Sequence, residues 1–211
     1  MLRDRYWERE MRKKLVWMPE IGIGSCSVET PFDLYTKLYV ENYKQLGQTE
    51  MGRALNKFRV EFVKRYHQGE EVFDYGAGAG DFIKAWGAGA VGYDMFAAGE
   101  GLRDMGKFRI PEDDGWEAVT FWDSLEHLKQ PEEALMCSRK WVFISMPIYL
   151  DVEHVLRSKH YKPGEHLWYW THEGLLRWMQ FNGFTSVGAN SGETDLGREG
   201  IGTFAFRRVN G

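Results

Sequence analysis

Residues 71–81 read Glu-Val-Phe-Asp-Tyr-Gly-Ala-Gly-Ala-Gly-Asp, and this stretch decides the fold. Val72 and Phe73 have the β-branched and aromatic character of a buried strand. Three glycines then occupy alternate positions, where the missing Cβ lets the backbone turn sharply: Gly76, Gly78 and Gly80. The helix expected over residues 81–86 points its N-terminus over these glycines and favours an anionic group there. The stretch therefore predicts a strand, a ligand-binding loop and a helix.

Two acidic residues accompany this loop. Asp74 lies two residues before the first glycine, where its carboxylate can orient the loop or meet a cationic ligand group. Asp94 ends the next apolar run, 90–93, and an acid at the tip of a second strand is placed to accept both hydroxyls of a ribose. A dinucleotide fingerprint needs Gly-x-Gly-x-x-Gly, whereas the third glycine here comes one residue early. The spacing therefore disfavours a nicotinamide-dependent oxidoreductase, which is the first alternative.

Several motifs in order carry a family resemblance. The glycine spacing, with its two acids, resembles motifs I and II of the class I S-adenosylmethionine-dependent methyltransferases. The stretches 117–128 and 130–135 look like the fourth strand and following helix of that family's small-molecule branch, the group similar to ubiquinone-biosynthesis O-methyltransferases. Residues 166–176, closing at 182–184, are similar to a late segment of the same group. Four motifs in the right order indicate the family more strongly than a lone glycine loop.

The resemblance implies a Rossmann-like α/β fold: a seven-stranded, mostly parallel sheet with helices on both faces and an antiparallel last strand. The alternation of strand and helix patterns after residue 70 favours the same architecture. We expect strands near residues 71–75, 90–94, 107–110, 117–122, 141–146, 184–189 and 202–208. A methyltransferase core is expected over residues 69–211, after an N-terminal arm and helical lid over residues 1–68, all in one structural domain.

The N-terminal segment is expected to be mainly helical. Residues 17–27 are interpreted as a loop because they contain two glycines. Thr30 and Pro31 are typical of a helix start, and this helix is expected to end at Gly47; a second helix begins near Thr49. In the family that the chain resembles, such helices cover the substrate pocket. Two tyrosines of the first helix are therefore predicted to contact substrate, although a plain core stripe is the alternative: Tyr35 and Tyr39.

The resemblance also implies a cofactor site for S-adenosylmethionine, with S-adenosylhomocysteine as product. Asp74 and the three loop glycines, Gly76, Gly78 and Gly80, are predicted to surround the methionine moiety. Asp94 is predicted to bind the ribose, and Met95 to pack on the adenine. Asp123, after the fourth strand, is predicted to lie near the methionine amino group or the acceptor.

Catalytic and substrate residues are predicted from the loops beyond the strand ends. A hydroxyl or amine acceptor must lose a proton, and an imidazole that titrates near neutrality can take it, so His127 and Asp123 are the predicted catalytic residues. The alternative is that His127 only opens the following helix. Three side chains of the late segment are predicted to face the acceptor: His166, Trp168 and Trp170.

Composition argues against several classes of protein. The formal charge of -4 disfavours a nucleic-acid surface, because such surfaces usually neutralise several phosphates. Cys26 and Cys137 are far apart, which argues against a structural disulfide. No apolar run approaches a membrane span, and a soluble cytoplasmic protein is expected. The histidines show no metal-ligand spacing, so no metal is predicted; a site near Asp151 and Glu153 is the alternative.

These patterns predict a methyltransferase that transfers a methyl group from S-adenosylmethionine to an oxygen or nitrogen atom of a small-molecule acceptor. A methyltransferase that acts on nucleotides or nucleic-acid bases is one alternative, and stacking tryptophans would suit it. A module that binds the cofactor without catalysis is another, because a methyltransferase site needs no obligatory nucleophile.

Overall fold

The computed structural model describes residues 14–26, 41, 44–95, 97–111 and 115–209. The strands are β1 (Leu15–Met18), β2 (Ile23–Cys26), β3 (Val72–Tyr75), β4 (Ala90–Tyr93), β5 (Trp116–Trp122), β6 (Ser138–Tyr149), β7 (Trp168–Thr171), β8 (Phe184–Asn190) and β9 (Ile201–Arg208). The helices are α3 (Glu50–Lys64), α4 (Asp81–Trp86), α5 (Ala97–Asp104), the 3-10 helix η2 (Leu125–His127), α6 (Pro131–Leu135), α7 (Val152–Arg157), α8 (His172–Phe181) and α9 (Gly192–Asp195).

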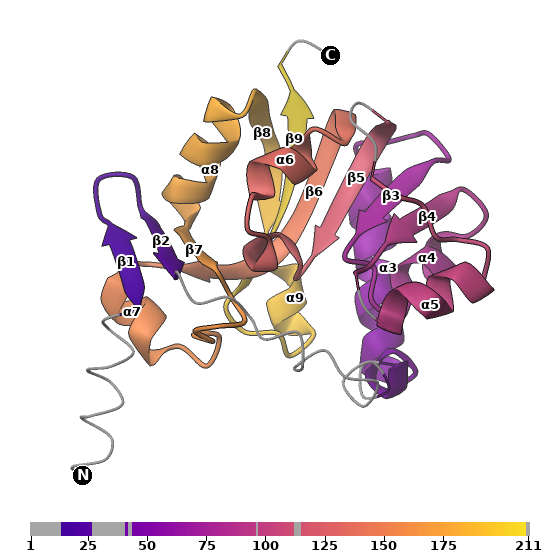
Figure 1. The fold of residues 1–211 in the computed structure, drawn as a ribbon, viewed down its shortest axis with the longest axis horizontal. Coiled ribbons are helices and arrows are strands. Elements are labelled where there is room, and N and C mark those ends of the chain that lie inside the picture. Colours follow the sequence, from indigo (N-terminus) through magenta and orange to yellow (C-terminus); the bar gives the residue numbers. More distant parts are fainter. Residues whose placement is uncertain (1–13, 27–40, 42–43, 96, 112–114, 210–211) are drawn as a thin grey trace.

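The strands form one sheet in the order β1-β2-β7-β6-β5-β3-β4, with β9 paired to β6 and β8 paired to β9 (Figure 1). The central strands β4, β3, β5, β6 and β7 pair in parallel, and β9 runs antiparallel to β6. Parallel strands joined through helices and closed by an antiparallel pair make the Rossmann-like fold that the sequence predicts. The described sheet has nine strands rather than the expected seven.

Part of the difference in strand count comes from a hairpin at residues 15–26, where the sequence predicted a loop. β1 and β2 pair with each other, and β2 pairs with β7, which extends the sheet beyond β6. Gly22 has a φ of +69° in the turn, and Gly24 lies so close to Trp17 that an added Cβ would stand 2.7 Å from its ring. The loop interpretation was wrong because these glycines serve a tight turn and a close side-chain contact within two short strands.

The predicted strand at 107–110 is also absent as a strand. Phe108 makes a single parallel bridge with Gly92 of β4, through hydrogen bonds from the Gly92 N–H to the Lys107 carbonyl and from the Arg109 N–H to the Gly92 carbonyl, both of 2.9 Å. The sequence predicted no strand between residues 146 and 184, whereas residues 147–172 contain the end of β6 and all of α7 and β7. β6 (Ser138–Tyr149) is therefore longer than the strand predicted near residues 141–146.

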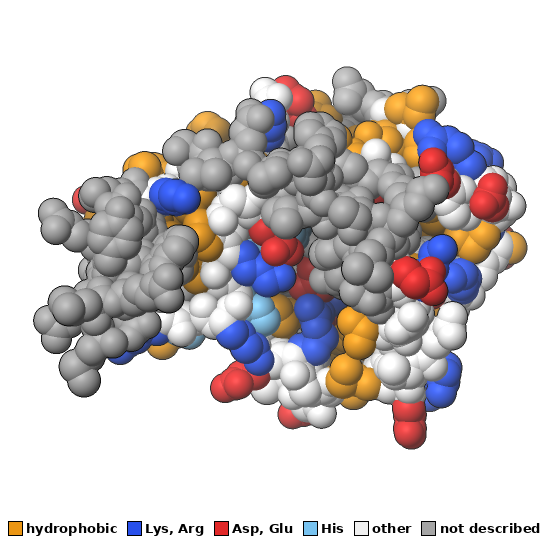
Figure 2. Space-filling model, turned by 60° about the horizontal axis from the view of Figure 1, so that its bottom comes forward, with side chains coloured by type: hydrophobic (Ala, Val, Ile, Leu, Met, Phe, Trp, Pro, Cys, Tyr) orange, Lys and Arg blue, Asp and Glu red, His pale blue; other side chains and the backbone are white. Residues whose placement is uncertain are grey.

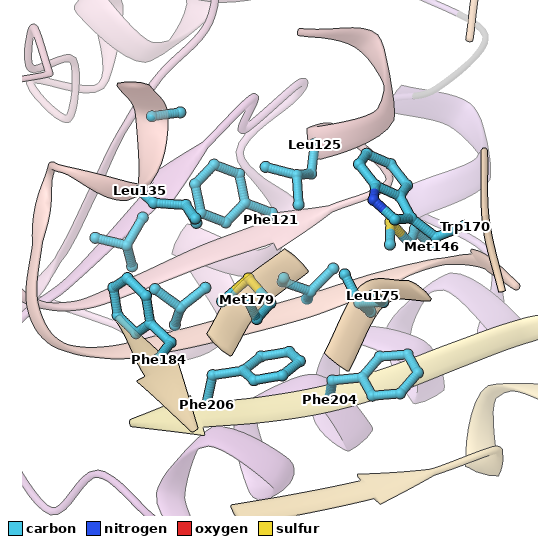
Figure 3. Close-up of a cluster of buried hydrophobic side chains, with 14 of the residues drawn as sticks. Phe121, Leu125, Leu135, Met146, Trp170, Leu175, Met179, Phe184, Phe204 and Phe206 are labelled. Carbon is cyan, nitrogen blue, oxygen red and sulfur yellow. The ribbon is translucent and has the colours of Figure 1, made fainter. Parts of the chain in front are cut away.

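Side chains alternate between the two faces of the sheet, as the period of a strand requires. Phe121 of β5 and Phe206 of β9 belong to a core on one face, covered by Leu135 of α6 and by Leu175 and Met179 of α8 (Figure 3). The opposite core lies under α3, α4 and α5, and it includes Val72, Ala118, Phe143 and Ala205. Both faces of the sheet are packed with buried hydrophobic side chains. The carboxyl edge of the parallel strands is therefore where a ligand can bind.

α3 begins where the sequence predicted a helix start. The side chain of Thr49 accepts a hydrogen bond of 3.0 Å from the Gly52 N–H and so caps the helix. The preceding helix was expected over residues 30–47; of it, the described residues are 41 and 44–47, and these are helical. Among the described residues, no helix is both long and apolar enough to cross a membrane.

Candidate functional site

The glycine loop is fastened to two neighbouring strand ends. The N–H groups of Gly76 and Ala77 donate to the Tyr93 carbonyl over 2.8 and 3.0 Å, which ties the loop to the end of β4. Gly76 has a φ of +77°, and a Cβ added there would lie 2.5 Å from the Cβ of Ser124, which follows β5. Ser124 in turn donates to the Tyr75 carbonyl over 2.6 Å. The ends of β3, β4 and β5 therefore meet at this loop.

Among the described residues, none packs against the position where a side chain would stand at Gly78, the tip of the loop. Gly78 has a φ of +52°, and a Cβ added to it would meet no described heavy atom within 4 Å. Its N–H donates to Asp94 Oδ2 over 2.9 Å, so the carboxylate predicted to bind a ribose lies directly beside the glycines. Met95, which follows it, has a side chain that is 58 % exposed. The structure brings together the predicted loop and the acid at the tip of the second strand.

Asp74 lies behind the loop rather than on its open side. It is buried, and Thr120 of β5 donates to its Oδ1 over 2.7 Å. Burial raises the pKa of Asp74 to about 7, against the hydrogen bond from Thr120 and the positive charge of Arg59, which lower it. This carboxyl therefore sits at the balance between its neutral and charged forms near neutral pH.

A cluster of opposite charges surrounds Asp123, the predicted catalytic and cofactor-binding acid. Arg59 of α3 donates to Asp123 Oδ2 over 3.0 Å, and Arg198 donates to Asp123 Oδ1 over 2.8 Å. Both guanidinium groups also bind Glu193 of α9, Arg59 through its Nε over 2.9 Å. Ser145 of β6 donates to Glu193 Oε1 over 2.7 Å. Two arginines and two carboxylates thus form a closed, charge-balanced group at the end of β5 and β6.

This pairing determines the chemistry of Asp123. Burial acts to raise its pKa, but the guanidinium groups of Arg198 and Arg59 outweigh it and hold the pKa below its ordinary value. Asp123 has a φ of +55°, an uncommon conformation for a residue with a Cβ, and its two ion pairs fix it there. A carboxylate so strongly stabilised in its charged form is a poor proton acceptor.

The sequence did not indicate the three other members of this cluster, which are Arg59, Arg198 and Glu193. Arg59 and Glu193 are 134 residues apart, and no local pattern connects them. One feature of the sequence could have indicated Arg59. It lies three positions before the fully buried Phe62, so the two residues share one face of α3 and a charged side chain stands beside the apolar stripe. Glu193 is likewise completely buried, in a segment that the sequence presents as a polar loop.

His127 and His166 meet beside this cluster. Their ring centroids are 4.7 Å apart with an interplanar angle of 85°. Burial lowers the pKa of His127 from its ordinary value, against the opposing effect of Glu165, and burial with the neighbouring His127 lowers the pKa of His166 to about 2. Both imidazoles are therefore neutral near pH 7. Glu126, which directly precedes His127, is buried, and this burial raises its pKa well above the ordinary value.

The predicted substrate residues occupy different places. Trp168 is half-buried and donates from Nε1 to the Leu128 carbonyl over 2.9 Å, next to η2. Trp170 is 1 % exposed and packs inside the hydrophobic core between Trp168 and Trp178, so in this conformation its ring is covered by protein (Figure 3). Tyr35 and Tyr39 lie outside the described residues.

Figure 2 looks at the carboxyl edge of the sheet, where acidic, basic and histidine side chains lie together near the centre.

Residues 47–188, more than half of the chain, match a family described as a methyltransferase domain. The chain belongs to this family. It is an S-adenosylmethionine-dependent methyltransferase, as the motifs around Gly76 and Asp94 predict. A comparison with curated protein sequences finds no match.

Solved structures share the fold of this methyltransferase at low sequence identity. A magnesium protoporphyrin IX methyltransferase from Synechocystis, crystallised with S-adenosylhomocysteine, superposes with a TM-score of 0.60 at 13 % identity and covers 83 % of this chain and 97 % of its own. A possible histamine N-methyltransferase from Thermotoga maritima has a TM-score of 0.58 at 14 % identity, with coverages of 81 % and 97 %. A [4+2]-cyclase reaches 0.56 at 13 % identity, covering 78 % and 84 %.

The residues of this chain are compatible with an adenosyl cofactor. No described atom lies within 4 Å of a Cβ added at Gly78, and a carboxylate lies beside this glycine at the tip of β4. In open α/β sheets, ligands bind outside the carboxyl ends of the strands, which is where these groups lie. The family likeness and the loop geometry therefore agree on the same edge of the sheet.

Proposed function

We propose that this methyltransferase transfers a methyl group to an oxygen or nitrogen atom of a small-molecule acceptor that binds at the carboxyl edge of the sheet. The observation that carries the proposal is the glycine loop, where no described atom lies within 4 Å of a Cβ added at Gly78, with Asp94 beside it and the end of β5 against the same loop. The names of two structural neighbours, a porphyrin methyltransferase and a possible histamine methyltransferase, support a small acceptor. The net charge of -4 supports it over a nucleic acid.

Each side of the loop has a proposed task on the cofactor. We infer that Asp94 accepts hydrogen bonds from the ribose hydroxyls while it holds the Gly78 N–H, and that Met95 covers the adenine. Gly76 and Gly80 give the backbone its turn around the methionine moiety, with the Asp74 carboxyl behind them. When bound, the cofactor supplies an electrophilic methyl group on a sulfonium. The protein has to hold the acceptor in line with it and exclude water.

On the acceptor side, proton acceptance falls to His127 rather than to Asp123. The two arginines occupy both oxygens of Asp123, whereas His127 presents a neutral imidazole at the end of η2. We propose that Trp168 and His166 line the acceptor side of the site, because both lie next to η2. The tasks of Asp123 would then be to set the backbone at the end of β5 and to hold α3 and α9 together.

A screen for the acceptor tests this function directly. The protein is incubated with methyl-labelled S-adenosylmethionine and fractionated pools of small metabolites, and labelled products are identified. Label is expected on an oxygen or nitrogen atom of a small molecule, and a variant with Gly78→Ala should lose most of it. Labelled nucleotides or nucleic acid would instead support the base-methylating alternative. Cofactor binding without any transfer to these pools would contradict the proposed function.

Gly78→Ala should weaken binding of S-adenosylhomocysteine by roughly tenfold or more, because the added methyl group would occupy the place beside the loop that we propose for the cofactor. Forcing a left-handed φ on alanine costs about 1–2 kcal/mol of stability, so the variant should still fold. Gly106→Ala is the matched control, since Gly106 has a φ of +67°, no described atom within 4 Å of an added Cβ, and a place beyond α5. Calorimetric titration measures both. Equal affinities in the two variants would place the ligand elsewhere.

A further inference from the structure

Three side chains of the kinds that bind metal ions converge where η2 meets the chain before β7. Glu126 and His127 come from η2, and His166 comes from the chain that leads into β7. One potential ligand atom from each residue lies within 4.8 Å of the others. The backbone fixes this meeting, because the Leu167 N–H donates to the Glu126 carbonyl over 2.8 Å.

Two members of this group have buried side-chain atoms with no hydrogen-bond partner among the described residues. Glu126 is 2 % exposed, and neither of its carboxylate oxygens has a hydrogen-bond partner among the residues that the structure describes. His166 is 5 % exposed, and its Nδ1 is likewise unpartnered there. Buried polar atoms almost always have a partner, and a buried carboxylate is costly without one. On binding a cation, the Glu126 carboxyl would release its proton, and the carboxylate and the neutral imidazole would then supply the lone pairs that bind the cation.

The third residue is oriented as metal-bound histidines commonly are. His127 Nδ1 is 2.8 Å from the Glu165 carbonyl oxygen. A carbonyl can only accept, so Nδ1 carries the proton and Nε2 is the nitrogen with the lone pair. A backbone carbonyl that fixes the tautomer and the ring orientation is the usual outer partner of a histidine that ligates a metal.

We propose that Glu126, His127 and His166 bind one divalent transition-metal ion. Two imidazoles and one carboxylate are a common ligand set for Zn²⁺, and imidazole also suits Co²⁺, Fe²⁺ and Ni²⁺, whereas Mg²⁺ and Ca²⁺ prefer oxygen ligands. Metal bonds of about 2.0–2.2 Å in a tetrahedral site would require these ligand atoms to move closer together than the 4.8 Å within which they now lie. This inference goes beyond the proposed function, because binding of the ion requires neither cofactor nor acceptor. In the metal-bound protein, the ion would take the Nε2 lone pair of His127, so His127 would serve there as a ligand and would accept a proton only in the metal-free protein.

The sequence predicted no metal site because metal-ligand motifs are recognised by short spacings between ligands, and His166 lies far along the chain from Glu126 and His127. Glu126 and His127 are adjacent in the chain, and neighbouring residues of this kind are too common to indicate a ligand pair. His166 joins them only through the contact between η2 and the chain before β7. The alternative site that the sequence suggested near Asp151 does not coincide with this group: the Asp151 carboxylate caps α7 by accepting from the His154 N–H.

Titration of the protein with Co²⁺, after treatment with a chelator, tests the proposal. We expect one Co²⁺ per chain by equilibrium dialysis, with visible absorption bands of protein-bound cobalt. Glu126→Gln and His166→Asn should each weaken binding at least tenfold. His172→Asn is the control, because His172 has a side chain that is 51 % exposed and lies on α8. Its affinity should equal that of the unsubstituted protein.

X-ray absorption of the Zn²⁺-loaded protein provides a test that needs no substitution. The spectrum should show two imidazole nitrogens and at least one oxygen at about 2.0–2.2 Å. Less than one ion per chain, a first shell without two imidazoles, or full affinity in both folded ligand variants would each overturn the proposal. If circular dichroism showed that a variant had not folded, the absorption spectrum of the unsubstituted protein would decide alone.

Discussion

Glu193→Gln is expected to lower the free energy of unfolding by about 3 kcal/mol or more, because it leaves two guanidinium groups with a single carboxylate. Glu193 is completely buried and binds both Arg59 and Arg198. Removing one member of a buried ionic group strands the charge of its partners, and that penalty exceeds the loss of the hydrogen bonds themselves. Urea denaturation monitored by tryptophan fluorescence measures the change.

Two comparisons make this prediction specific. Glu117→Gln removes an ion pair of similar length, 2.9 Å to Lys140, but between side chains that are 42 % and 37 % exposed, so its effect should stay below about 1 kcal/mol. The double substitution Arg59→Met with Glu193→Gln should cost less than the sum of the two single changes, because Arg198 and Asp123 then remain as a balanced pair. If Glu193→Gln and Glu117→Gln lower the free energy of unfolding by the same amount, the buried cluster contributes no more to stability than a surface ion pair does.

Asp74→Asn is expected to change how stability depends on pH. The folded protein holds a proton on Asp74 up to about pH 7, whereas the unfolded chain releases it near pH 4. Between these values, the unsubstituted protein should therefore lose up to about 1.4 kcal/mol per pH unit as the pH rises, and no more above pH 7. Asparagine can still accept the hydrogen bond from Thr120 but carries no charge. The stability difference in favour of Asp74→Asn should rise from about pH 4 to about pH 7 and then level off.

Thr120→Val provides the internal control for this pH dependence. The hydrogen bond from the Thr120 hydroxyl lowers the pKa of Asp74. Without this hydroxyl the pKa of Asp74 should be higher, and stability should continue to fall up to a higher pH. In the presence of Asp74→Asn, the same substitution should leave the pH dependence unchanged. A stability difference that does not vary with pH would show that Asp74 is charged throughout, as a carboxylate in contact with water would be. Denaturant midpoints at a series of pH values settle the point.

The fold and the cofactor loop could be predicted because their signals are local. The residues from Val72 to Gly80 are contiguous, and a strand, a tight turn and a helix follow from their residue types alone. Asp94 is separated from them by one crossover helix, and parallel pairing of β3 with β4 necessarily brings its position to the loop. The period of two in β5, β6 and β9 likewise determined the two buried faces.

The remainder of the site depends on contacts between distant segments. Glu193 reaches Arg59 only because β9 pairs with β6 in one particular register, which places α9 over the end of β5. His166 reaches His127 only because the chain before β7 returns to η2. The hairpin at residues 15–26 finds its partner in β7, far along the chain. No window of sequence contains both sides of these contacts, so residue types alone could not indicate them.

The central claim is that S-adenosylmethionine binds between the glycine loop and the acid at the tip of β4. Calorimetric titration of the cofactor into the unsubstituted protein and into Asp94→Asn tests it most directly, because asparagine can still accept from the Gly78 N–H and only the charge is lost. We predict saturable binding of S-adenosylmethionine, none of NAD, and a loss of about 1–3 kcal/mol in Asp94→Asn, the range for hydrogen bonds to a charged group. Equal affinity in both proteins, or preferential binding of NAD, would contradict the account.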